Sequence, residues 1–165
     1  MNGIHVYAAI DLLALSDEAV ERPAPGAAPT AFRIWRAGNN PTDKGMTVFS
    51  KRSADVLLAA QAKRGNLVSI DVDHLSLKDA APPAARKAVG WHRLDTRPDA
   101  DGNPELWAVD VEWTDEVKAG LEKDPPEWRH FSPAYVLDAK TCEVVAYINT
   151  ALTNNPATWN NTTLA

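Results

Sequence analysis

Cysteine is almost absent from this chain, and its scarcity limits how the chain can be stabilised. Cys142 is the only one, so no disulfide forms within the chain and no zinc site is built from several cysteines. Low cysteine content suits a reducing compartment. The 165 residues are enough for one domain with a real core that requires neither a metal nor a disulfide.

Long apolar runs and an excess of positive charge are also missing. No apolar segment approaches the roughly 20 residues that a membrane-spanning helix requires. The first residues lack a basic region and Asp11 interrupts their apolar run, so we interpret them as a strand rather than a signal peptide. The net charge of −5 argues against a nucleic-acid binder, which usually has a basic face. We therefore expect neither a membrane nor a nucleic acid as a partner.

Two segments have helical character. The first follows Ser50 or Ser53, either of which is suited to be an N-cap, and it ends at Gly65, a residue typical of helix C-termini. The second follows Thr114, with acidic residues in its first turn, where they favour the helix dipole. We expect both helices to lie outside a β core.

Most other segments alternate apolar and polar residues, as strands do. Residues 38–45 are rich in Gly, Asn and Pro, which predicts a turn, and residues 139–142 are short enough to join the last two strands as a hairpin. About seven strands follow one another with few helical crossovers. This order predicts a mainly β fold with flanking helices (α+β), in the form of a small, mostly antiparallel sheet or β-barrel.

The strand-like segment 128–136 contains Ser132, which is either an ordinary strand serine with a wet face or a nucleophile. A serine hydroxyl needs a base to take its proton, and histidine is the natural base. His74 is favoured because it ends an apolar strand, where a rigid element supports functional groups. His130 shares the strand and face of Ser132, from which its reach is awkward. The remaining histidines, His5 and His92, are more simply packed or surface residues.

Five segments occur in the order typical of one known family. They are IDVDH at 70–74, AVGWHRL at 88–94, LWAVDVEWT at 106–114, WRHFSPAYV at 128–136 and ALTNNPA at 151–157. Together they resemble the head-maturation (prohead) serine proteases of phage Mu and Mu-like prophages, the Mu-like prophage I protein family. The resemblance runs from about Asn66 to Ala157. It implies a fold similar to that of herpesvirus assemblins and other prohead proteases, a β-barrel core ringed by helices.

The resemblance also implies a serine–histidine pair, with Ser132 as nucleophile and His74 as base. A third member falls near Asn149, where related proteases have an acidic residue. Asparagine orients a histidine but stabilises imidazolium less than a carboxylate does. Asp71 and Asp73 are alternatives, although Asp73 needs a bend in the chain to reach the ring. A dyad without a third member is a further alternative.

Arg129 stands three positions before Ser132, where the family usually has an arginine. In the herpesvirus relatives an arginine helps to hold the oxyanion-stabilising water, so Arg129 is a candidate for oxyanion support. The alternative is a salt bridge to a carboxylate. The resemblance implies no cofactor and no metal.

For the whole chain, the resemblance implies a protease domain over residues 1–157 and a C-terminal tail, 158–165, leading toward a scaffold region. The implied activity is cleavage of scaffold protein, of the protease itself and of procapsid proteins, inside the procapsid in the cytoplasm of the bacterial host. Herpesvirus relatives become active on dimerisation, which raises a homodimer as a candidate assembly. The competing function is an inactive protease-fold module for capsid assembly or scaffold anchoring, which Asn149 favours. An esterase usually has a G-x-S-x-G motif, and the residues around Ser132 do not match it.

Overall fold

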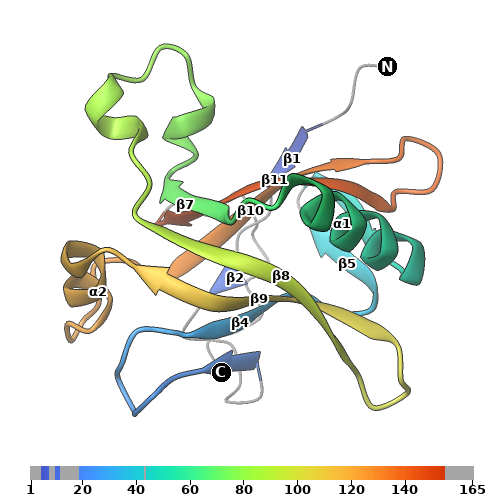
Figure 1. The fold of residues 1–165 in the computed structure, drawn as a ribbon, viewed down its shortest axis with the longest axis horizontal. Helices are drawn as coiled ribbons and strands as arrows, with labels where there is room; N and C mark the ends of the chain where they lie inside the picture. Colours follow the sequence, from blue (N-terminus) through green and yellow to red (C-terminus); the bar gives the residue numbers. More distant parts are fainter. Residues whose placement is uncertain (1–4, 8–9, 12–18, 43, 155–165) are drawn as a thin grey trace.

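The computed structural model describes residues 5–7, 10–11, 19–42 and 44–154, and within them the chain is mainly β (Figure 1). The strands are β1 (His5–Tyr7), β2 (Ile10–Asp11), β3 (Val20–Glu21), β4 (Ala31–Trp35), β5 (Gly38–Thr42), β6 (Gly45–Phe49), β7 (Val68–Val72), β8 (Gly90–Pro98), β9 (Pro104–Trp113), β10 (His130–Leu137) and β11 (Val144–Thr153). The α-helices are α1 (Lys51–Arg64) and α2 (Asp115–Leu121), and the short 3-10 helices are η2 (Leu75–Leu77) and η3 (Pro83–Arg86). The predicted tail, 158–165, lies outside the described residues.

One strongly curled sheet forms the body of the molecule. Its strand order is β1-β10-β11-β7-β8-β9-β4-β3, with β2 also paired to β10. Apart from the two-residue strands β2 and β3, seven strands build it. Neighbours are antiparallel except β11 and β7, which run parallel, so the sheet is mixed. In Figure 1 the helices α1 and α2 lie at opposite ends of this sheet.

The predicted mainly β fold with flanking helices is confirmed, but the closed barrel is not what the sheet forms. In the described ranges the strand order ends at β1 and β3, and no ladder joins these two edges, which leaves a half-barrel. Both edge strands are only two or three residues long, so neither offers a long row of backbone groups for closure. The mixed character arises because β11 returns beside β7 rather than pairing only with its neighbour in sequence.

The prediction of a turn over residues 38–45 is wrong in part. Residues Gly38–Thr42 form β5, which pairs with β6 in a separate hairpin. The Thr42 hydroxyl donates to the carbonyl of Gly45 over 2.7 Å, closing the chain reversal. Pairing with β6 therefore outweighs the low strand propensity of Gly, Asn and Pro.

Both helices begin where the sequence predicts. Ser50 is the N-cap of α1, since its hydroxyl accepts from the backbone N–H of Ser53 over 3.1 Å. Gly65 ends the helix in the left-handed region, with φ of 67°. Thr114 occupies the N-cap position of α2, although its side chain forms no capping hydrogen bond.

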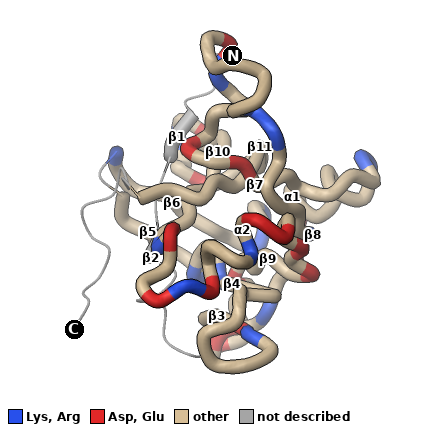
Figure 2. The backbone as a smooth tube through the Cα atoms, turned by 90° about the vertical axis from the view of Figure 1, so that its left-hand side faces the viewer, with Lys and Arg blue, Asp and Glu red and all other residues tan. Residues whose placement is uncertain are grey.

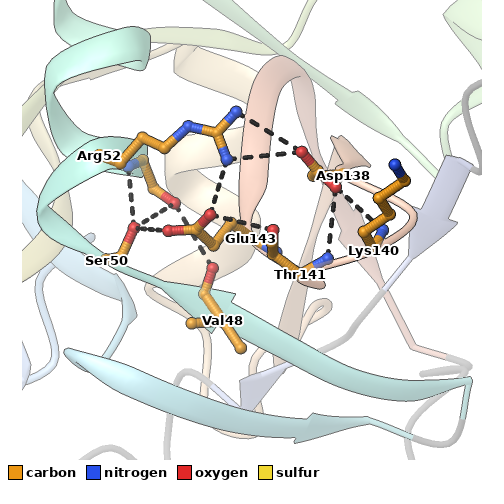
Figure 3. A network of polar contacts seen from close by, with 8 residues as sticks. Val48, Ser50, Arg52, Asp138, Lys140, Thr141 and Glu143 are labelled. Atoms are coloured by element: carbon orange, nitrogen blue, oxygen red, sulfur yellow. Dashed lines mark hydrogen bonds and ion pairs between the residues drawn. The ribbon is translucent and has the colours of Figure 1, made fainter.

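The start of α1 is tied to the turn between β10 and β11 (Figure 3). The Ser50 hydroxyl donates to the Glu143 carboxylate over 2.6 Å, and the Arg52 guanidinium bridges Glu143 at 2.7 Å and Asp138 at 3.4 Å. Hydrogen bonds from the backbone N–H groups of Lys140 and Thr141, with a smaller contribution from Arg52, hold the pKa of Asp138 below its usual value. Hydrogen bonds from Ser50 and Arg52 do the same for Glu143. The first turn of α1 is thus anchored to the turn of the β10–β11 hairpin.

A second anchor holds the last turns of α1 against β8. The Gln61 side chain donates to the carbonyl of Leu94 over 2.9 Å and accepts from its N–H over 2.7 Å. Pairing between β7 and β8 stops at His92, so no strand of the described residues lies beside this edge of β8 beyond that residue. The amide of Gln61 supplies the two hydrogen bonds that a neighbouring strand would have made.

The concave face of the sheet encloses the apolar core. Trp35 and Tyr135 meet edge to face with ring centroids 4.6 Å apart, and Phe32 packs on Phe131 at 4.5 Å. Pairs of this kind stabilise a core beyond the area that they bury. Phe131 of β10, Leu152 of β11 and Ile70 of β7 belong to this core, so the residues that alternate with them in the paired segments lie on the other face of the sheet.

The surface charges of the chain are mixed. Figure 2 shows Lys and Arg positions interspersed with Asp and Glu along the backbone. Within the part of the chain that the structure describes, neither helix has the length and apolar character needed to cross a bilayer.

Candidate functional site

Three neighbouring strands place Ser132 and Asp71 in one row on the outer face of the sheet. Ser132 of β10 lies opposite Ala151 of β11, and Ala151 lies opposite Asp71 of β7. Residues opposite one another in a sheet point to the same face, and two strand spacings separate the row's ends by about 10 Å. The small side chain of Ala151 stands between them, and all three residues are buried.

Asn149 belongs to the same outer face. It lies opposite Ala134, two residues along β10 from Ser132. Asn149 and Ser132 are therefore diagonal neighbours, a relation that places backbones about 7–8 Å apart and within reach of one intervening ring. The sheet register thus brings Ser132, Asn149 and Asp71 around one patch.

A sharp turn after β7 returns His74 to that patch. Asp73 and His74 both adopt left-handed backbone conformations, with φ of 51° and 54°. Two such residues in succession are uncommon outside glycine and cost on the order of 1–3 kcal/mol each, so the surrounding contacts must hold them. The N–H of Asp73 donates to the carbonyl of Leu152 over 2.9 Å, and the carbonyl of His74 accepts from the N–H of Leu77 over 3.0 Å.

His74 Nδ1 lies 2.9 Å from Asn149 Oδ1. On its other side, Asn149 Nδ2 donates to the Ser76 hydroxyl over 3.1 Å. The Ser76 hydroxyl and the Ser76 backbone N–H, the latter over 2.8 Å, both donate to Asp71 Oδ2. One chain of hydrogen bonds therefore runs from the ring of His74 through Asn149 and Ser76 to the carboxylate of Asp71.

The members of this chain are removed from water. Asp71 is fully buried, Asn149 is 2% exposed and His74 is 8% exposed. Burial lowers the pKa of His74 below its usual value. The hydrogen bond that His74 donates to Asn149 and the charges of Asp71 and Asp73 act in the opposite direction, and Lys78 adds to the lowering. His74 is therefore neutral at neutral pH, the state in which an imidazole accepts a proton.

Ser132 is not a strand serine on a wet face. It is 4% exposed, and Phe131 through Tyr135 are all buried, so both faces of β10 are covered there. His74, held by Asn149, lies on the same outer face as this hydroxyl. The structure thus joins the expected histidine to Asn149 and places the expected serine on the same face of the sheet as Asn149, while their catalytic roles stay a prediction.

The other candidates differ in their environments. Asp73 is exposed and its charge favours the protonated form of His74, whereas Asp71 is part of the hydrogen-bond chain. Arg129 is exposed just before β10, and its guanidinium forms no ion pair with the carboxylates that the structure describes. Its backbone N–H donates to Asn154 Oδ1 over 3.2 Å, which secures the entry to β10. His130 opens β10 two residues before Ser132.

His92 lies on the opposite, concave face and is a packed histidine. Its Nδ1–H donates to the carbonyl of Arg93 over 3.0 Å, so its Nε2 accepts from the Thr150 hydroxyl over 2.8 Å. Tyr147 in turn donates to Thr150 over 2.6 Å. Burial lowers the pKa of His92 to about 4. The hydrogen-bonded group of His92, Thr150 and Tyr147 does not reach Ser132, because the sheet lies between them.

Ser76 is the member of the outer-face chain that the sequence does not single out. It lies in a segment expected to be a loop, and loop residues have no periodicity that indicates side-chain direction. Among the described residues, no three His, Cys, Asp or Glu side chains are grouped as metal ligands would be.

Comparison with known proteins gives one result. A family model described as "Mu-like prophage I protein, N-terminal domain" matches residues 32–165. No curated protein and no solved structure matches the chain significantly.

Proposed function

We propose that this chain, which belongs to the family of Mu-like prophage I protein N-terminal domains, is a serine endopeptidase with Ser132 as nucleophile and His74 as general base. One observation supports the proposal above all. The ring of His74 is hydrogen-bonded through Nδ1 to Asn149, a diagonal neighbour of Ser132 on the same face. Triad histidines are held in this way, with Nδ1 toward the orienting group and Nε2 toward the serine.

In the proposed reaction, His74 Nε2 takes the proton of Ser132 as its oxygen attacks a peptide carbonyl. The carbonyl π electrons move to the oxygen, and backbone N–H groups, aided by Arg129, stabilise that oxyanion. The protonated His74 then gives its proton to the departing amine as the peptide bond breaks. Water, activated by the same ring, hydrolyses the resulting acyl-enzyme and releases the acid product.

The substrates that we propose are scaffold protein, the protease itself and other procapsid proteins, cut inside the procapsid in the bacterial host during head maturation. These substrates follow from the resemblance to prohead proteases and from membership of a prophage family. A homodimer is the proposed assembly, by the same analogy. The proposed protease domain spans residues 1–157.

Cleavage of a defined peptide library tests the activity. The full chain and its Ser132→Ala variant are each incubated with the library, and new termini are identified by mass spectrometry. We expect a shared sequence preference around the new termini with the unchanged chain and none with Ser132→Ala. Equal cleavage by both would assign the activity to a contaminant.

The competing function is an inactive module that anchors scaffold or assists capsid assembly. The amide at position 149, where an acid would stabilise imidazolium better, is the feature that favours it. Such a module would leave the library intact and would still bind scaffold protein.

A further inference from the structure

We propose that Asp71 and Ser76 are positioning residues, which fix the ring of His74 in the tautomer protonated at Nδ1 by acting through Asn149. Their catalytic meaning rests on the proposed function. The tautomer itself is a property of the folded chain, and it is measurable whether or not the chain is a protease.

The direction of each hydrogen bond follows from the carboxylate end. An ionised carboxylate only accepts, so the hydroxyl of Ser76 donates to Asp71. With its proton committed, that hydroxyl accepts from the amide group of Asn149 over 3.1 Å. The carbonyl oxygen of Asn149 then faces His74, and an oxygen only accepts, so His74 Nδ1 must carry the proton.

The position of the ring proton determines which nitrogen of His74 can act as the proposed base. With its proton at Nδ1, a neutral imidazole has its lone pair at Nε2, the nitrogen that must take the proton of Ser132. If Asn149 turned its amide by half a rotation, it would present donors to Nδ1 and favour the opposite tautomer. Ser76 and Asp71 prevent that rotation, because a reversed amide would place its oxygen against the lone pairs of the Ser76 hydroxyl.

The burial of Asp71 indicates that its carboxylate does more than cap the turn after β7. Its side chain is fully buried, and its Oδ1 has no hydrogen-bond partner among the residues that the structure describes. A buried carboxylate is costly to a fold unless it is hydrogen-bonded, and the donors to Asp71 are the N–H and the hydroxyl of Ser76, both at Oδ2. If Asp71 only capped the turn, the backbone N–H of Ser76 would satisfy it, and the hydroxyl and Asn149 would be dispensable.

Three charged groups face His74. Asp71 and Asp73 favour its protonated form, whereas Lys78 disfavours it. Of these, only Asp71 is also connected to the ring by hydrogen bonds. Removing its charge is therefore expected to lower the pKa of His74 further and to weaken the tautomer preference.

Nitrogen-resolved NMR of the ring tests the inference. The full chain is labelled with ¹⁵N-histidine in the Ser132→Ala background, which removes any activity from the readout. We expect His74 to show a protonated Nδ1 and an unprotonated Nε2 at neutral pH. Ser76→Ala should move the ring toward the Nε2-protonated form, Ser76→Thr should restore the original tautomer, and Asp71→Asn should lower the pKa of His74.

The outcomes separate positioning from structural support. Ser76→Ala and Ser76→Thr both retain the backbone N–H that caps the turn, so a tautomer unchanged in Ser76→Ala would overturn the inference. If Ser76→Ala fails to fold, Asp71→Asn and Ser76→Thr decide it, and a pKa of His74 unmoved by Asp71→Asn contradicts it. In the active chain, Ser76→Ala is expected to lower kcat about 10–100-fold with little change in KM. The predicted tautomer without peptide cleavage would leave the inference standing and remove the proposed function.

Discussion

Asn149 stands where the proposed protease would have its third catalytic residue. The side-chain carbonyl oxygen of Asn149 accepts the hydrogen bond that orients the ring of His74, and the amide adds no charge. Because burial lowers the pKa of His74, its ring is neutral at neutral pH. As the partner of the proposed base, an asparagine keeps that ring oriented at some loss of imidazolium stabilisation.

Replacing Asn149 by Asp is expected to move the acid limb of the kcat/KM profile to higher pH, by about one unit or more. A carboxylate beside the ring stabilises imidazolium, so His74 loses its proton only at a higher pH. The profile is measured on a peptide substrate across the acid range.

Asn149→Ala is the control for this pH shift. It removes the hydrogen bond that raises the pKa of His74, so its acid limb should move to lower pH while kcat falls. An Asn149→Asp profile that overlays that of the unchanged chain would show that position 149 does not act on the base.

At the residue scale, the sequence indicates Ser132 and His74 as candidates more readily than it indicates the residues that hold His74 in place. Ser132 and His74 are identifiable from an alternating strand, a strand end and the order of family motifs. Ser76 is not, because its role depends on two consecutive left-handed residues, Asp73 and His74, that fold the loop back over the sheet. Neither Asp73 nor His74 is a glycine, the residue that commonly marks a left-handed backbone, so the local sequence does not predict this turn.

At the scale of elements, α1 is held to the sheet by polar contacts at both ends. Arg52 and Ser50 bind the hairpin turn at one end, and Gln61 completes the edge of β8 at the other. The sequence predicts this helix and both of its caps, since these depend on neighbouring residues. It does not predict the docking partners, which are more than 30 positions away along the chain.

Gln61→Ala is expected to lower the free energy of unfolding by about 1–3 kcal/mol, since it removes both hydrogen bonds to the partly buried backbone of Leu94. Urea unfolding followed by circular dichroism measures the change. Lys63→Ala, an exposed position in the same last turns of α1, is the matched control and should stay within about 0.5 kcal/mol. Equal stability of Gln61→Ala and the unchanged chain would mean that water replaces the side chain at no cost.

At the scale of the whole molecule, the curled sheet uses its two faces for different purposes. The concave face holds the aromatic core and the buried His92, and the outer face holds Ser132, His74 and the hydrogen-bond chain to Asp71. Alternation along β10, β11 and β7 produces this division, so its periodicity is visible in the sequence. The open edge and the parallel β11–β7 pair are not, because they depend on long-range pairing that no local pattern encodes.

The Ser132–His74 pair is tested by the rate at which a fluorophosphonate labels the folded chain, with the modified residue located by peptide mass spectrometry. We expect one adduct, on Ser132, and no adduct in Ser132→Ala. His74→Ala should label at least about 100-fold more slowly, as expected when a general base is lost, while His130→Ala, the matched histidine on the same strand as Ser132, should label normally. An adduct on another residue, or equal labelling of His74→Ala and the unchanged chain, would contradict a Ser132–His74 pair.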